Sequence, residues 1–155
     1  MKKLLFSVLV FAILSAVSLP AHAAPDFSGT WVLDVNKSDL GMKNPEAKAH
    51  MKKVVLIIKQ TATKLSIERS TGDVAVYNLD GSESVNSQPG GGQSKTTMNW
   101  AGDKLVAKTI SNASGTNIRS TEERSLSANG KEMVLRVSLQ MPSGERKQTL
   151  VYTKQ

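Results

Sequence analysis

Few residues in this chain have the types and spacing that catalysis or metal binding requires. The 155 residues include two histidines and no cysteine, and His50 is the only histidine after residue 23. One histidine without any cysteine does not build a common zinc site. A Ser-His-acid triad would depend on His50, yet the chain has no G-x-S-x-G turn to expose a serine nucleophile. We therefore expect no catalytic residue and no metal site.

Three other polar segments resemble functional motifs but lack the required spacing. Gly90–Lys95 is glycine-rich, yet it lacks the G-x-x-x-x-G-K-[ST] pattern and no helix signal follows it. Glu122 and Glu123 are adjacent in a strand-like stretch, so their carboxylates point to opposite faces and do not meet at one substrate. Asp80–Glu83 has too few spaced acidic ligands for calcium. These patterns favour a non-enzymatic protein without a cofactor.

The first 23 residues have the pattern of a secretion signal. Lys2 and Lys3 precede the mostly apolar run Leu4–Leu19, and Pro20–Ala23 supplies a helix breaker and an A-x-A-like cleavage site. The run is shorter than the roughly 20 apolar residues that a membrane span needs. The sequence therefore predicts a signal peptide at residues 1–23, with cleavage after Ala23, and a periplasmic or secreted protein. Cleavage after Ala24 is the near alternative.

Residues 24–155 have the length of one domain, large enough to bury a core without disulfides. The whole chain has a formal net charge of +7, which falls to +5 without Lys2 and Lys3 because residues 1–23 contain no acid. This balance suits solubility and also makes an anionic membrane surface a candidate partner. Aromatic side chains do not interleave with the basic clusters, so we expect no nucleic-acid binding.

Most of residues 24–155 consists of strand-like segments separated by turns. Asn44-Pro45 predicts the start of one short helix that Glu46–Lys52 continues. Ser82–Gln93, rich in glycine, predicts the longest loop. About nine strands are expected at roughly 8–12-residue spacing: Phe27–Val35, Val54–Ile58, Leu65–Arg69, Val74–Leu79, Lys95–Trp100, Leu105–Ile110, Ile118–Leu126, Met133–Leu139 and Gln148–Thr153.

Successive strands with short turns favour an up-and-down meander, and closing the meander removes exposed sheet edges. We therefore predict an all-β fold: an antiparallel up-and-down β-barrel of about 8–10 strands with one short helix after the first strand. A sandwich is the alternative. A membrane-spanning barrel is disfavoured because its strands need about 9–11 residues and aromatic girdles, whereas aromatic residues make up 5% of this chain.

The segment Gly29-Thr30-Trp31 resembles the G-x-W motif of the lipocalins and the wider calycin superfamily. Four segments are similar to the corresponding parts of small exported bacterial lipocalin-like proteins: Phe27–Trp31, Asn36–Asp39, Leu126–Lys131 and Leu150–Tyr152. The resemblance implies a barrel with a cup for a small apolar ligand, and it implies that Gly29 and Trp31 anchor its closed end. It also implies a basic residue across Trp31. Arg124, Arg136 and Lys154 are the candidates.

Two functions are compatible with such a barrel. The first is binding of a small apolar or amphipathic molecule by a monomer, with Met98 and Met133 as adaptable filler. The candidate ligand-binding residues, each of which ordinary core packing would also explain, are Leu33, Tyr77, Trp100, Leu135 and Tyr152. The alternative is a protein-interaction module or inhibitor that docks through open-end loops such as Ser82–Gln93.

Overall fold

The computed structural model describes residues 24–41, 54–88, 91–113 and 116–155. The expected signal peptide (1–23), the expected helix over Glu46–Lys52 and His50 all lie outside these ranges. Within them every regular element is a strand. No helix in the described ranges is long and apolar enough to cross a membrane.

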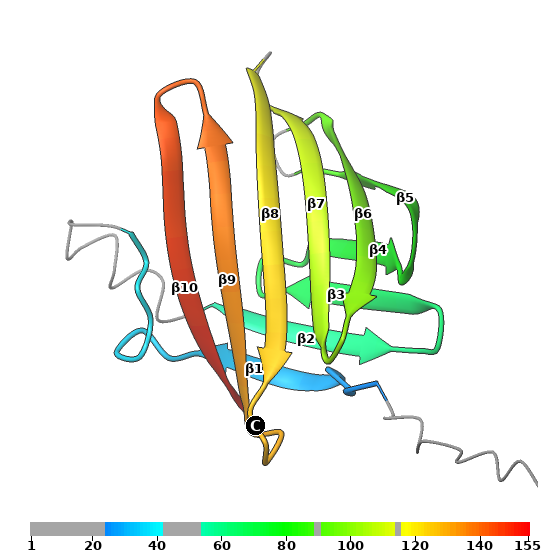
Figure 1. Cartoon of the computed structure of the whole chain (residues 1–155), viewed down its shortest axis with the longest axis vertical. Helices are drawn as coiled ribbons and strands as arrows, with labels where there is room; N and C mark the ends of the chain where they lie inside the picture. The colour runs from blue at the N-terminus through cyan, green and yellow to red at the C-terminus, as the bar shows by residue number, and fades with distance from the viewer. Residues whose placement is uncertain (1–23, 42–53, 89–90, 114–115) are drawn as a thin grey trace, which may run out of the picture.

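Ten antiparallel strands form one continuous sheet that curls into a nearly closed barrel (Figure 1). The order of neighbours is β4-β3-β2-β1-β10-β9-β8-β7-β6-β5. This confirms the all-β antiparallel meander and the expected strand number. The strands are β1 (Gly29–Leu33), β2 (Val55–Gln60), β3 (Lys64–Arg69), β4 (Val74–Asn78), β5 (Asp80–Ser87), β6 (Gln93–Ala101), β7 (Lys104–Ala113), β8 (Thr116–Leu126), β9 (Glu132–Met141) and β10 (Gly144–Lys154).

The tenth strand is the one that the sequence did not predict. The prediction of a loop over Ser82–Gln93 was wrong for its first half, because β5 runs through Ser87. The only large apolar side chain in this strand, Val85, points outward and is 51% exposed. The inward position Ser84 is buried but carries a hydroxyl. Without an inward apolar residue, β5 has no hydrophobic alternation to identify it.

The meander closes where the first strand meets the last. Trp31 of β1 is opposite Lys154 of β10, and Leu33 is opposite Tyr152. The interruption lies elsewhere, between β4 and β5. There the Asn86 side chain accepts a hydrogen bond from the backbone N–H of Val76 (2.8 Å) and donates one to its carbonyl (3.0 Å). A carboxamide has the donor and acceptor of a peptide group, so Asn86 bridges two strands that share no backbone ladder.

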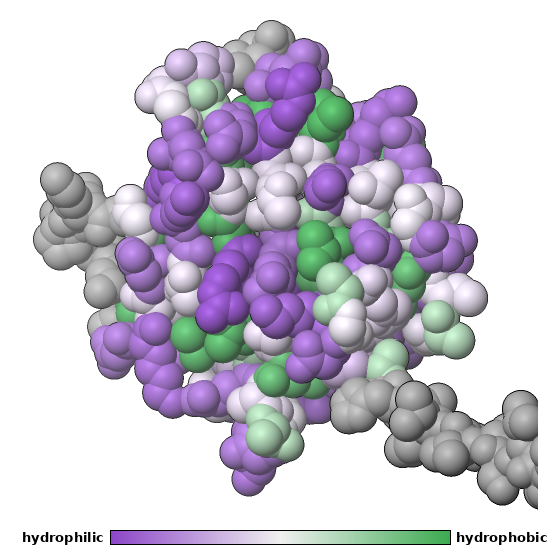
Figure 2. Space-filling model, viewed as in Figure 1, coloured by the Kyte–Doolittle hydropathy of each residue, from purple (hydrophilic) through white to green (hydrophobic). Residues whose placement is uncertain are grey.

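The strands alternate in burial, as expected where one face meets a core and the other meets solvent. In β6 the inward residues Ser94, Thr96 and Met98 are buried while their neighbours are exposed. The outward face in the view of Figure 2 is mainly hydrophilic with small separate apolar areas. The core is therefore the barrel interior.

One end of the barrel is filled by aromatic side chains. Trp31 is fully buried and its indole Nε1–H donates to the Phe27 carbonyl (2.8 Å). The Phe27 ring packs against Trp100, with centroids 6.1 Å apart. Gln60 Oε1 accepts from the Phe27 N–H (3.0 Å), which ties the segment before β1 to β2. Trp31 is therefore a fully buried core residue with a satisfied indole N–H, and its expected role as a structural anchor stays a prediction.

The structure identifies which basic residue crosses Trp31. Lys154 Nζ lies 5.3 Å from the centroid of the Trp31 ring, within cation–π range. Arg124 points into the barrel, and Arg136 is exposed on the outer face. The basic residue implied by the resemblance is therefore Lys154.

Candidate ligand-binding site

The barrel interior contains a cavity of about 240 Å³ beyond the aromatic end. Five strands, β2, β3, β8, β9 and β10, line it with their inward-facing residues. The lining comprises Leu56, Ile67, Arg69, Glu122, Arg124, Leu135, Val137, Leu139, Gln148, Leu150 and Tyr152. Six of these side chains are aliphatic, so most of the wall is apolar. The polar members lie mainly on β8 and β10.

Arg124 is the most unusual residue of this cavity. It is a charged side chain on the inward face of β8, and the residue is only 5% exposed. Its Nη2 donates to Glu122 Oε2 at 2.6 Å. Its Nε and Nη1 are buried and have no hydrogen-bond partner within the described part of the chain. Buried donors are nearly always paired in folded proteins with protein groups or ordered water, so these N–H groups can donate to a water molecule or a ligand in the cavity.

Strand alternation explains why Arg124 points inward. Residues two apart on a strand face the same side, so Glu122 and Arg124 share the inner face of β8. Glu123 takes the outer face, where its Oε1 accepts from Lys104 Nζ (3.0 Å) and Arg136 Nη1 (3.3 Å). The hydrogen bond from Lys104 is the main cause that lowers the pKa of the Glu123 carboxyl. The two neighbouring glutamates therefore lie on opposite faces of β8, as their adjacency predicted.

Tyr152 supplies the second polar group, on β10. The residue is 3% exposed, and burial raises the pKa of its phenol to about 12. The Arg124 charge opposes this rise and the Glu122 charge adds to it. At neutral pH the phenol is therefore un-ionised and keeps both its O–H donor and its acceptor.

A second polar region of the interior lies on β5 to β7. Thr96 of β6 and Thr109 of β7 share a hydrogen bond of 2.9 Å between their hydroxyls. The Ser84 hydroxyl accepts from the Asn78 backbone N–H (2.8 Å). These hydroxyls are satisfied by protein partners, whereas Arg124 is not. In the described part of the chain, the buried side-chain donors without a partner are Arg124 Nε and Nη1 and Arg146 Nε, and of these two residues Arg124 lines the cavity.

The structure places the five predicted ligand-binding residues in two groups. Leu135 and Tyr152 line the cavity. Leu33 is buried in the core, and Tyr77 and Trp100 pack against that core from partly buried positions. Met98 and Met133, the expected filler, are fully buried core residues.

Sequence reasoning did not identify Glu122 and Arg124 as interior groups. The signal was their position in the expected strand Ile118–Leu126. Both have the same parity as its apolar ends, Ile118 and Leu126, which predicts a charged pair on the inner face. Following the inward–outward alternation across the polar positions of this strand identifies Glu122 and Arg124 as inward-facing residues.

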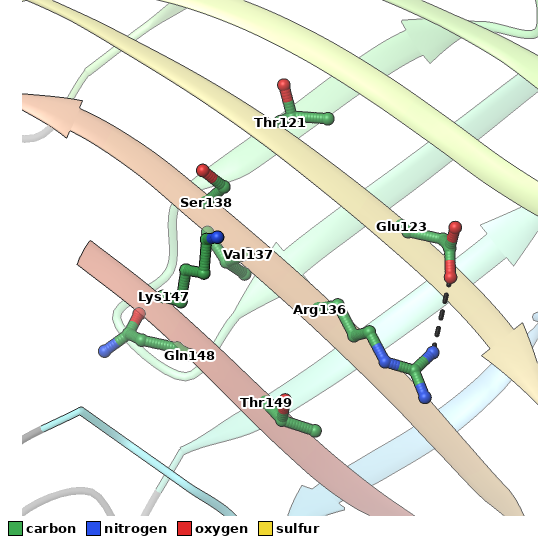
Figure 3. A pocket seen from close by; sticks show the side chains of 8 residues that line it. All are labelled: Thr121, Glu123, Arg136, Val137, Ser138, Lys147, Gln148 and Thr149. Atoms are coloured by element: carbon green, nitrogen blue, oxygen red, sulfur yellow. Dashed lines mark hydrogen bonds and ion pairs between the residues drawn. The ribbon is translucent and has the colours of Figure 1, made fainter. Parts of the chain in front are cut away.

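A second hollow, on the outer face, is a weaker candidate (Figure 3). It has about the same volume, 250 Å³, and lies over β8, β9 and β10. Its charged side chains are solvated: Arg136 is 57% and Lys147 is 74% exposed. Arg136 is paired with Glu123 (Figure 3). Exposed, paired charges on a strand surface provide little binding energy, so we do not assign the site there.

The described ranges contain no group of three or more His, Asp or Glu side chains that is placed to hold a metal ion. Glu122 is the one acidic residue in the cavity lining. What this arrangement offers is an apolar wall with localised donors, which is the usual composition of a small-molecule binding site.

Comparison with known proteins gives likeness in structure alone. No family model and no curated protein sequence matches the chain. A zebrafish ileal bile acid-binding protein in complex with cholic acid superposes with a TM-score of 0.60 at 16% identity, covering 83% of this chain and 98% of that one. A fatty acid transporter, REP1-NXSQ, gives 0.57 at 18% identity, covering 83% and 95%. A tyrosine-to-phenylalanine mutant of the same transporter gives 0.54 at 16% identity, covering 83% and 97%. At these identities the likeness shows the fold alone, which is an antiparallel β-barrel.

Proposed function

We propose that this protein is an exported, non-enzymatic barrel that binds a small apolar or amphipathic molecule in its interior cavity. The observation that carries the proposal is the pair of unpartnered N–H groups of Arg124 in a mainly apolar cavity. An amphipathic ligand would place its chain against the aliphatic wall and a hydrogen-bond acceptor at Arg124. Such an acceptor would satisfy donors that are otherwise costly to bury.

The size of the cavity sets the scale of the ligand. Its volume of about 240 Å³ is just below the roughly 300–1,000 Å³ of typical ligand pockets. The aliphatic lining residues Leu56, Ile67 and Leu150 would contact a medium-length alkyl chain. Burying that chain contributes about 0.8 kcal/mol per methylene group.

Two independent likenesses support binding over catalysis. The solved structures with this fold are named as a bile acid-binding protein and a fatty acid transporter. The G-x-W segment around Trp31 resembles the lipocalin-like exported proteins. The mainly aliphatic lining of the cavity suits the same general class of cargo.

The proposal that the protein is exported is supported by the signal-peptide pattern of residues 1–23. In this proposal the signal peptide is removed after Ala23, and residues 24–155 act as a single lipocalin-like domain, monomeric, in the periplasm or outside the cell. Mass spectrometry of the protein recovered from its natural compartment tests the cleavage site. An intact Met1 in that material would contradict export by cleavage.

Ligand binding is tested by filling the cavity. Val137 is a half-buried lining residue on β9, and its neighbour Arg136 points outward. Val137→Trp should abolish binding of the uncharged fluorophore N-phenyl-1-naphthylamine and of decanamide, which displaces it from the wild-type protein. Arg136→Trp should leave the binding of both molecules unchanged. Native mass spectrometry before and after solvent extraction checks for a bound natural molecule. Failure of the wild-type protein to bind the fluorophore, together with a clean apo mass, would contradict the proposal.

A second candidate function is docking on an anionic membrane surface. In the described ranges, four of the five large exposed apolar side chains lie on the outward faces of β4, β5 and β7: Val74, Val76, Val85 and Ile110. In the pairing across β5, β6, β7 and β8, Val85 neighbours Lys95, Lys95 neighbours Ile110 and Ile110 neighbours Arg119. Alternating apolar and cationic side chains are complementary to an anionic lipid surface.

Vesicle sedimentation tests this candidate. The protein should sediment with vesicles of phosphatidylglycerol and phosphatidylcholine, but not with phosphatidylcholine alone. Ile110→Glu should prevent sedimentation, and Thr121→Glu, an outward residue on β8, should weaken it less. Equal sedimentation of wild type and Ile110→Glu would exclude this face.

A further inference from the structure

We propose that the cavity selects ligands with an uncharged polar head group, and that Glu122 is the residue that excludes a carboxylate. This inference rests on the proposed function, since it concerns the head group of a ligand held in the same cavity. It is drawn from the ion pair inside the barrel, where the positive charge of Arg124 already has a partner.

The positive charge of Arg124 is neutralised by the protein itself. Arg124 Nη2 and Glu122 Oε2 are 2.6 Å apart, and their side chains are 6% and 28% exposed. Opposite charges at this separation and burial interact more strongly than a surface pair because little water screens them. An anionic ligand therefore does not meet an isolated cation in this cavity. It meets an ion pair with no net charge.

A carboxylate ligand at Arg124 would lie beside the carboxylate of Glu122. Two like charges at one desolvated site disfavour each other, and one of them would have to take up a proton or leave. Arg69 also lines the cavity, but the residue is exposed, so solvent and salt screen its charge. Apart from Arg124 itself, the charge in the cavity lining that solvent screens least is therefore that of the partly buried Glu122.

An uncharged head group meets no such opposition. The oxygen of an amide, ester or alcohol accepts hydrogen bonds from Arg124 Nε–H and Nη1–H, the two donors without a partner. The N–H of an amide also finds an acceptor in the Glu122 carboxylate. Tyr152, whose phenol is un-ionised at pH 7.5 and whose pKa burial raises further, to about 12, adds a neutral donor and acceptor. The polar groups of the cavity therefore complement a carboxamide better than a carboxylate.

Decanamide and decanoate form a matched pair for the test, because they differ only in the head group. Dissociation constants at pH 7.5 are measured by displacement of N-phenyl-1-naphthylamine from wild type, Glu122→Gln and Glu123→Gln. We expect wild type to bind decanamide at least about tenfold more tightly than decanoate. Glu122→Gln should lower this preference by about tenfold, mainly through tighter decanoate binding. Glu123→Gln changes the neighbouring outward glutamate and should leave the preference unaltered.

The outcomes separate this inference from the function on which it rests. If neither ligand nor the fluorophore binds wild type, the proposed function fails. If both ligands bind and decanoate is equal or tighter in wild type, the selection of an uncharged head is wrong. If wild type prefers decanamide but Glu122→Gln keeps that preference, Glu122 is not its cause. Glu122→Ala provides the same comparison, and circular dichroism confirms the fold of each variant.

Discussion

Lys154 crosses the face of Trp31 through the space that Gly29 leaves open. A Cβ on Gly29 would lie 2.5 Å from Lys154 Cε, closer than any ordinary contact. Gly29 also has a φ of +141°, where residues with a side chain are strained. The glycine of the G-x-W segment is therefore explained mainly by its backbone angle. The lysine side chain adds a smaller steric cost, because its flexible end can shift.

Gly29→Ala should lower the free energy of unfolding by about 1–3 kcal/mol, because it adds backbone strain and a clash. Gly130→Ala is the control: its φ is also positive (+66°), but nothing lies within 4 Å of the added Cβ. Urea denaturation of both variants, alone and combined with Lys154→Ala, separates the two effects. The Gly29→Ala loss should shrink when Lys154 is shortened, whereas the Gly130→Ala loss should not change. Identical losses in both backgrounds would exclude the close approach as a cause.

Trp31→Ala should destabilise the protein by about 3–5 kcal/mol, since a fully buried ring is removed and leaves a cavity. Removal of the indole also leaves the Phe27 carbonyl without its hydrogen-bond donor. Urea denaturation followed by circular dichroism measures the change. A loss below about 1 kcal/mol would show that Trp31 does not anchor the closed end.

Much of the fold is present in the alternation of apolar residues. Nine strands were predicted from such stretches as Leu65–Arg69 and from their turns. Closure of the meander was predicted as well, and the structure shows that β1 closes it by pairing with β10. β5 was missed because Asp80–Ser87 has polar residues on its inner face, so no period of two distinguishes it from a loop. The interruption between β4 and β5 also has no sequence signal, because Asn86 bridges it through its side chain.

The candidate site was less predictable than the fold. Leu135 and Tyr152, two of the five expected ligand-binding residues, line the cavity, and their contact with a ligand stays a prediction. Arg124 was considered only as a residue across Trp31, which the structure assigns to Lys154. Its burial depends on Glu122 as a partner within the barrel, and the presence of a cavity depends on how all the strands curl together. The local alternation places Glu122 and Arg124 on the inner face, but it does not contain the shape or the size of the cavity.

The bridge between β4 and β5 predicts a specific loss of stability. Asn86→Ala should cost about 1–3 kcal/mol, because both backbone groups of Val76 lose their partner. Asn99→Ala is the matched control on β6, where the amide makes a single long contact of 3.4 Å to the Trp100 carbonyl. Hydrogen exchange of the Val76 amide should accelerate in Asn86→Ala alone. Unchanged exchange would show that the bridge does not hold the two strands together.

Tyr152 should ionise only in strongly alkaline solution. In a Tyr77→Phe variant it is the only tyrosine, so ultraviolet absorbance follows its phenol alone. We expect a midpoint of about 12 in the folded protein and about 10 after denaturation. A folded midpoint at the denatured value would show that water reaches the phenol.

The same shift makes stability depend on pH. The folded pKa of Tyr152 lies above its unfolded value, so the native state holds the proton more tightly. The stabilisation is complete below about pH 10 and is lost as pH rises towards 12. Between these limits wild type should lose about 2 kcal/mol more than Tyr152→Phe. Parallel stability curves for the two proteins in this window would contradict the shift.

Binding of decanamide with and without the Arg124 donors tests the proposed site most directly. Removing Arg124 alone would leave Glu122 without its partner, so Arg124→Met is compared within the Glu122→Gln background. Loss of two hydrogen bonds to the ligand should weaken decanamide binding by about 10–100-fold, as measured by calorimetry. Arg136→Met, on the outer face, should leave the affinity unchanged. Equal decanamide affinity with and without Arg124 would show that the ligand's head group does not lie at this arginine.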